Sequence, residues 1–226
     1  MTADPFVALA RSPSHGAPVV LARGTLPVAL LFVIAATLVS ALVAVRMATE
    51  SNVDELFLPE TRHPAVTAMI QTLGTERTAV ILYLVQRTFD AAVVATAITP
   101  LFIWLLGSSA VHAAARLAGV RRPYLPILVL FGYAAALTLI PSSAVHLALG
   151  FDRGVGAQLA QLVELVCFVW LAVLAYRGVR AHYEVGQNAA IRILLVALLL
   201  FYLVPLAFIV LAAVAIVVAA LVLGYF

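Results

Sequence analysis

The chain has 226 residues, of which 65% are hydrophobic and 10% are charged. Soluble domains carry about 25% charged residues, so this composition excludes a water-soluble globular protein and indicates one that lies largely in lipid. The formal net charge is +3, and all of its basic residues are arginine. Membrane topology accounts for that excess, so no nucleic-acid partner is expected.

Residues 1–24 precede the first apolar stretch and are rich in proline, serine and glycine. They are predicted to form a flexible cytoplasmic tail. The stretch that follows, Leu26–Val45, is longer than the roughly 7–15 apolar residues of a signal peptide. It is therefore expected to be retained as a first membrane helix, and cleavage near Ala44 is the alternative.

Five apolar stretches are each about long enough to cross a hydrocarbon core of roughly 30 Å as an α-helix, at about 1.5 Å per residue. They predict an all-α polytopic membrane protein, with one domain of five transmembrane helices over residues 25–226. The predicted spans are about 26–45, 88–111, 125–149, 157–177 and 191–223.

Two segments outside regular spans leave alternatives open. Pro64–Leu73 has apolar residues at helical spacing, which predicts a short amphipathic helix that lies on the membrane surface or packs on the other helices. The last apolar stretch, from Ile193, is longer than a bilayer requires. Tilt, a kink at Pro205 or an interfacial first turn would accommodate it.

Arginine distribution orients the chain. Eight arginines lie in the N-terminal segment and in the loops between spans two and three and spans four and five, whereas the other loops combine five arginines with most of the acids. The positive-inside rule then predicts a cytoplasmic N-terminus and an external C-terminus. Arginine-only basic usage, with abundant small apolar residues, predicts a bacterial inner membrane, or a Golgi or ER membrane if the source is eukaryotic.

Three stretches of the chain resemble the Yip1 domain family. They are Trp104–Gly119, Val129–Pro141, and the sequence W-L-A-V-L-A-Y-R-G-V-R-A-H that starts at Trp170. The resemblance covers about Leu26–Phe226 and implies five spans with the N-terminus inside. The Asp-Leu-x-Gly-Pro motif of the eukaryotic members does not occur in this sequence. Their binding of Rab-type GTPases is therefore not carried over.

Several residues in the spans are expected to set helix packing or kinks. Proline inside a helix removes one hydrogen bond, so Pro141 should kink the third span, where Ser142 and Ser143 can satisfy the freed carbonyls. The residues assigned to packing or kinks are Gly132, Tyr133, Pro141, Pro205, Trp170 and Gly178.

Glu164 is the most suggestive single residue, because it lies about 12 Å into the fourth span by helical rise. Charges within the membrane are costly and often functional. Glu164 should face the bundle interior, within reach of Arg87, His146 or Asp90, and the predicted polar cluster consists of Glu164, Gln161, Gln158, His146, Arg87 and Asp90. It would serve either as an interhelical network or as a proton, ion or solute site.

A second set of residues lies on the predicted cytoplasmic side. Its arginines either bind anionic lipid head groups or only set topology. They are Arg116, Arg121, Arg122, Arg177 and Arg180. His112 and His182 lie nearby and are expected to snorkel or cap helices. The scattered histidines match no metal spacing, so neither a metal nor a cofactor is expected.

These patterns predict a non-enzymatic scaffold or adaptor of the Yip1 type in membrane organisation or trafficking. Its expected partners are the lipid bilayer and another membrane protein or a second copy of the chain. One alternative is a small ion or solute permease that uses the Glu164 cluster. Another is an accessory subunit of a larger membrane complex.

Overall fold

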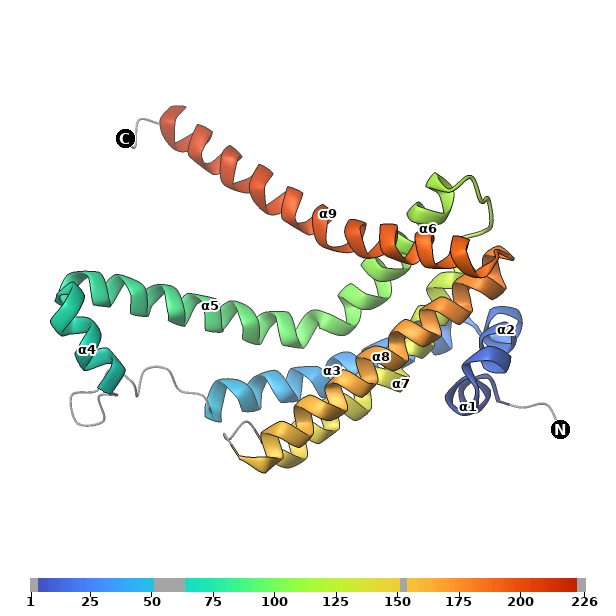
Figure 1. Cartoon of the computed structure of the whole chain (residues 1–226), viewed down its shortest axis with the longest axis horizontal. Helices are drawn as coiled ribbons and strands as arrows, with labels where there is room; N and C mark the ends of the chain where they lie inside the picture. The colour runs from blue at the N-terminus through green and yellow to red at the C-terminus, as the bar shows by residue number, and fades with distance from the viewer. Residues whose placement is uncertain (1–3, 51–63, 151–153, 223–226) are drawn as a thin grey trace. The chain divides into compact units, whose positions relative to one another are not determined.

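The computed structural model describes residues 4–50, 64–150 and 154–222, and the regular structure in these ranges is helical (Figure 1). The helices are α1 (Pro5–Arg11), α2 (Pro13–Arg23), α3 (Leu26–Glu50), α4 (Pro64–Leu73), α5 (Thr75–Phe102), the π-helical turn η2 (Ile103–Gly107), α6 (Ser108–Leu117), α7 (Leu125–Leu149), α8 (Val155–Tyr183) and α9 (Gln187–Val222).

Five helical runs are long and apolar enough to cross a membrane: α3, the continuous run from α5 through η2 to α6, α7, α8 and α9. The all-α fold with five candidate spans is therefore confirmed. The second run is much longer than predicted, from Thr75 to Leu117, because hydropathy marks the lipid-immersed part of a helix and not its ends. The last stretch is a single helix that continues through Pro205.

The prediction that residues 1–24 form a flexible tail is wrong for the described part of that segment. Pro5 and Pro13 occupy the first turns of α1 and α2, where a proline lacks no needed hydrogen bond. The Asp4 carboxylate caps α1 by accepting from the amide of Phe6 at 2.8 Å. The two helices pack together and bury Leu9 and Val20, so the turn-forming residues start helices here.

The chain divides into two compact units, described here separately. The first consists of Met1–Leu30, Phe102–Ala134 and Ala172–Phe226, and the second of Leu31–Leu101 and Ala135–Leu171. Within the first unit, α6 and η2 pack against α9. The buried residues of α6 are small or β-branched, which lets its backbone approach its neighbours. They are Ser108, Ala110, Val111, Ala114 and Ala115.

Two glycines of the first unit permit close helix contact, as predicted for packing residues. A Cβ placed on Gly132 of α7 would lie 2.7 Å from the Cβ of Ala29 on α3. A Cβ on Gly178 of α8 would lie 2.0 Å from Cδ2 of the buried Leu130 on α7. Neither site can accept a larger side chain without movement.

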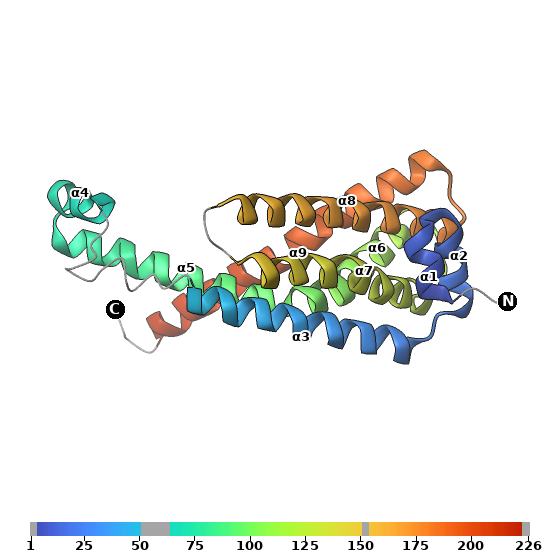
Figure 2. The ribbon, with the colours of Figure 1, turned by 90° about the horizontal axis from the view of Figure 1, so that it is seen from below.

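Within the second unit, α4 has the predicted bounds and turns at Gly74 into α5 (Figure 2). The hydroxyls of Ser40 on α3 and Ser143 on α7 lie 3.2 Å apart, close enough for a hydrogen bond. Ser143 thus contacts a second helix just beyond Pro141. Because α7 is continuous through Pro141, this proline does not end the helix, and the kink expected there stays a prediction.

Candidate functional site

A polar cluster in the first unit joins three separate parts of the chain. We call it the seam, and it consists of Trp104, Ser108, Ser109, His112, Tyr124, His182 and Tyr183. Ser108 and Ser109 on α6 each lie 2.9 Å from the hydroxyl of Tyr124, which precedes α7. The indole of the buried Trp104 donates to the carbonyl of Leu128 at 2.9 Å. These contacts attach α6 to the start of α7.

The histidines of the seam attach the end of α8. His112 Nδ1 on α6 lies 3.1 Å from the hydroxyl of Tyr183, whose side chain is 3% exposed. Nε2 of His182 contacts the carbonyl of Pro123 at 2.8 Å; because Pro123 lies between α6 and α7, this contact ties the end of α8 to that segment and does not cap a helix. The rings of His112 and Tyr124 lie 5.2 Å apart. The spacing of the seam residues in the sequence does not indicate that their side chains contact one another.

An ion pair crosses beside the seam, between the Arg122 guanidinium and the Glu184 carboxylate. Glu184 follows the last residue of α8 and has a φ of 54°. This left-handed conformation is uncommon for a residue with a Cβ but is the usual one for the position that ends a helix. The pair therefore joins the turn before α9 to the segment before α7.

The other arginines of the predicted lipid-facing set are exposed in this unit. They are Arg116, Arg121, Arg177 and Arg180. Two of them share an aromatic neighbour: the guanidinium carbons of Arg177 and Arg180 lie 5.7 and 5.8 Å from the ring centroid of Tyr176. These separations are within the range of a cation–π contact.

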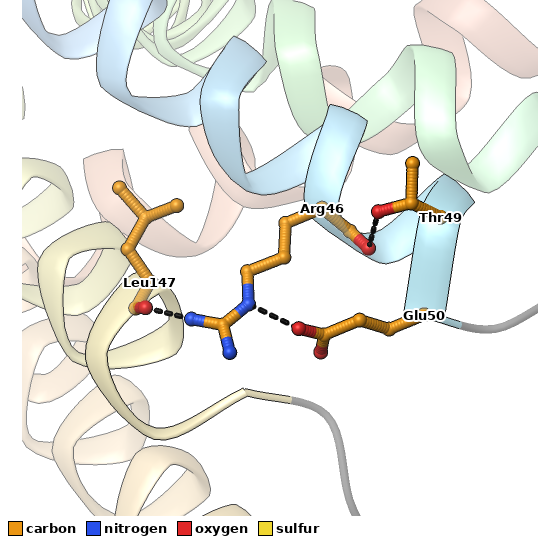
Figure 3. A network of polar contacts seen from close by, with 4 residues as sticks. All are labelled: Arg46, Thr49, Glu50 and Leu147. Atoms are coloured by element: carbon orange, nitrogen blue, oxygen red, sulfur yellow. Dashed lines mark hydrogen bonds and ion pairs between the residues drawn. The ribbon is translucent and has the colours of Figure 1, made fainter.

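The second unit contains a different polar contact, centred on Arg46 (Figure 3). One guanidinium nitrogen donates to the carbonyl of Leu147, and Nε donates to Glu50 at 2.5 Å. The Leu147 carbonyl is in the last turn of α7, where the helix itself supplies no donor. Gly150 follows with a φ of 74°, and its amide bonds the His146 carbonyl. The sequence predicted only a topological role for Arg46, because the carbonyl that it caps lies 101 positions away.

The predicted Glu164 cluster is present in part. Nε2 of His146 and Oε2 of Glu164 lie 3.4 Å apart, joining α7 to α8. The predicted interior position of Glu164 is wrong in this structure, because its side chain is 62% exposed. Gln158 and Gln161, earlier on α8, are exposed as well.

Arg87 and Asp90 form a pair of their own on α5, with Nη1 and Oδ2 separated by 3.5 Å. The Arg87 guanidinium also lies 5.1 Å from the ring centroid of Tyr83, and Asp90 accepts from the amide of Gln86 at 2.9 Å. These contacts all lie within one helix. The six predicted residues therefore do not form one cluster in the described structure. They form one contact between helices, His146–Glu164, one pair within a helix, Arg87–Asp90, and two exposed glutamines.

The remaining predicted packing residues differ in exposure. Tyr133 is buried in α7, and Pro205 is half-buried within α9. Trp170 is 37% exposed on α8, and its packing role stays a prediction. Among residues 4–50, 64–150 and 154–222, no three His, Cys, Asp or Glu side chains are grouped as a metal site requires.

Searches of curated proteins and of solved structures found no match. The Yip1 domain matches residues 7–209, nearly the whole chain. With five apolar helices that can each cross a bilayer, the chain is a multi-pass membrane protein. It belongs to the Yip1 domain family.

Proposed function

We propose that this protein is a non-enzymatic adaptor that binds another membrane protein, or a second copy of itself, through helix faces. The observation that carries the proposal is the two-sided character of α6. One side packs on α9 in the first unit, and the opposite side is uncovered. From the end of α5 through η2 into α6, exposed residues recur every three or four positions, as on one helix face: Phe102, Leu105, Ser109, Ala113 and Leu117.

Small residues on such a face favour helix association in lipid, because they allow two backbones to approach closely. Ala113 is exposed at the middle of the face, beside the buried Ala114. The histidine and tyrosine side chains of the seam also support a non-enzymatic role. His112, Tyr124 and Tyr183 are engaged with one another and with Ser108 and Ser109, an arrangement that holds helices together.

The test is a substitution that places a larger side chain on the uncovered face and leaves the seam residues unchanged. Ala113→Leu should reduce recovery of a bound membrane protein, or of a differently tagged second copy, in a mild detergent. Ala172→Leu, at an exposed alanine of α8, is the matched control and should leave recovery unchanged. Equal recovery from both variants, at equal thermal stability, would contradict the adaptor proposal.

A second candidate function, a small permease, is favoured by one observation. The His146–Glu164 contact places two titratable groups together on helices long and apolar enough to cross the membrane. A proton or solute pathway would use such groups. Proteoliposomes that carry the wild type should then show a flux that Glu164→Gln abolishes. A flux of that kind, with unchanged partner recovery, would replace the adaptor by the permease.

The third candidate, an accessory subunit, differs from a free adaptor in stoichiometry. A constant ratio between this chain and the proteins recovered with it would favour a subunit. For any of these functions we place the N-terminus in the cytoplasm of a bacterium and the C-terminus outside the inner membrane. The basis is the arginine distribution.

A further inference from the structure

Tyr176, Arg177 and Arg180 lie together near the end of α8, where the apolar span meets charged residues. Both guanidinium groups lie within 6 Å of the Tyr176 ring centroid, at 5.7 and 5.8 Å. Two like charges are thereby held beside one ring although they repel each other. Both arginine side chains are exposed, so a ligand can reach them.

The neighbouring acid does not neutralise these charges. Glu184 stands four residues after Arg180, the spacing at which helical side chains form ion pairs. Its carboxylate instead bonds Arg122. The ion pairs of the described chain use Arg46, Arg87, Arg122 and His146, and none includes Arg177 or Arg180. Two positive charges therefore remain for an external anion.

The position along the helix indicates which anion this is. Tyrosine rings are enriched at the level of lipid head groups, and arginines at a span end extend to the same level. A phosphodiester carries two unesterified oxygens, which match the planar donor fork of guanidinium. We infer that Tyr176, Arg177 and Arg180 form a binding site for the phosphodiester of an anionic phospholipid.

This site is separate from the uncovered face of α6 that carries the proposed adaptor function. Cationic side chains in the last turn of a helix also stabilise its dipole, so Arg180, in the last turn of α8, could act within the protein alone. The two roles differ in dependence on lipid. A dipole contact needs no lipid, whereas the inferred site binds phosphatidylglycerol more tightly than phosphatidylcholine, whose choline cation neutralises its own phosphate.

The experiment counts lipid molecules retained by the purified full chain in native mass spectrometry, after titration with phosphatidylglycerol or phosphatidylcholine. The double substitution Arg177→Gln/Arg180→Gln should weaken phosphatidylglycerol binding about tenfold, because two charge-assisted contacts are lost. The matched control is Arg11→Gln/Arg23→Gln, which removes the same charge from exposed arginines in the last turns of α1 and α2, outside the predicted lipid head-group set. It should change binding less than about twofold.

Substitutions of the ring separate an organised site from a general positive surface. Tyr176→Phe keeps the aromatic face and should retain binding, whereas Tyr176→Leu should weaken it. Equal losses for the two arginine pairs would overturn the inference, since net charge alone would then explain binding. Displacement of the lipid by millimolar glycerol phosphate would also overturn it, in favour of a soluble phosphate ligand.

Folding is monitored by thermal unfolding in the same detergent. If the double variant has a lower midpoint of thermal unfolding than the wild type, the single variants Arg177→Gln and Arg180→Gln test the lipid site instead. Each should weaken phosphatidylglycerol binding roughly threefold while the midpoint of unfolding stays near that of the wild type. Unchanged lipid binding in both single variants would contradict the site.

Discussion

Nδ1 of His112 on α6 and the hydroxyl of Tyr183 on α8 lie 3.1 Å apart, although 71 positions separate them in the sequence. The contact joins the second and fourth candidate spans within one unit. Because Tyr183 is buried, removal of its hydroxyl would leave His112 without this partner in a setting that water replaces poorly.

Tyr183→Phe should therefore destabilise the protein by about 0.5–1.5 kcal/mol, the usual range for one intramolecular hydrogen bond. The measurement is the thermal unfolding midpoint in detergent. Tyr202→Phe is the matched control, because Tyr202 is 63% exposed on α9, and its midpoint should stay at the wild-type value. Equal shifts in both variants would show that the His112 contact contributes nothing.

The contact between Gly132 and Ala29 predicts an effect of added volume. Gly132→Ala should destabilise the protein by about 1–3 kcal/mol, since the new Cβ would lie 2.7 Å from the Ala29 Cβ and α3 and α7 must move apart there. Addition of Ala29→Gly should restore part of the loss. Gly186→Ala is the control, since no atom lies within 4 Å of its Cβ position. A double variant no more stable than Gly132→Ala would rule out this contact as the cause.

Arg46 predicts a stability effect in the second unit. Arg46→Ala removes the donor that caps the Leu147 carbonyl and should destabilise the protein by roughly 1–3 kcal/mol. Arg87→Ala, which removes an exposed pair within one helix, should lower the stability less than Arg46→Ala does, because water screens an exposed ion pair. Unfolding midpoints of both variants provide the comparison. The reverse ranking would show that the Arg46 contact is not a stabilising cap.

Membrane orientation is tested by labelling single cysteines in a background where Cys167 is replaced by alanine. With the N-terminus inside, a cysteine at Ser14 should be shielded from a membrane-impermeant thiol reagent in intact cells. A cysteine at Thr49, exposed at the end of α3, should react. Both should react after permeabilisation. Reaction at position 14 and protection at position 49 would reverse the orientation.

Some helices were predicted from the sequence with their boundaries, and others were missed. The first and third spans begin at the residues expected, Leu26 and Leu125, because both follow breaker residues. The amphipathic helix Pro64–Leu73 was also predicted with its bounds. The helices before Leu26 were missed, since prolines that start a helix and prolines that form a turn read alike until the partner that buries Leu9 is known.

The candidate sites were less predictable than the spans. Sequence analysis paired His146 with Glu164, because both could be placed at the same depth in consecutive helices. It expected Arg87 and Asp90 to join them, whereas those two side chains bond each other on α5. Depth along a helix follows from residue number, but the direction in which a side chain points depends on how the helix is rotated against its neighbours.

The five apolar spans and the all-α fold follow from the sequence alone, because apolar length and composition are local properties that suffice for membrane insertion, and membership of the Yip1 domain family follows from the match over residues 7–209. Which polar groups contact one another depends on how the helices pack. The carbonyl of Leu147 receives its donor from Arg46, 101 positions away, and Tyr183 receives its partner from α6. Such bonds form only after packing brings separate helices into contact, so no local pattern encodes them.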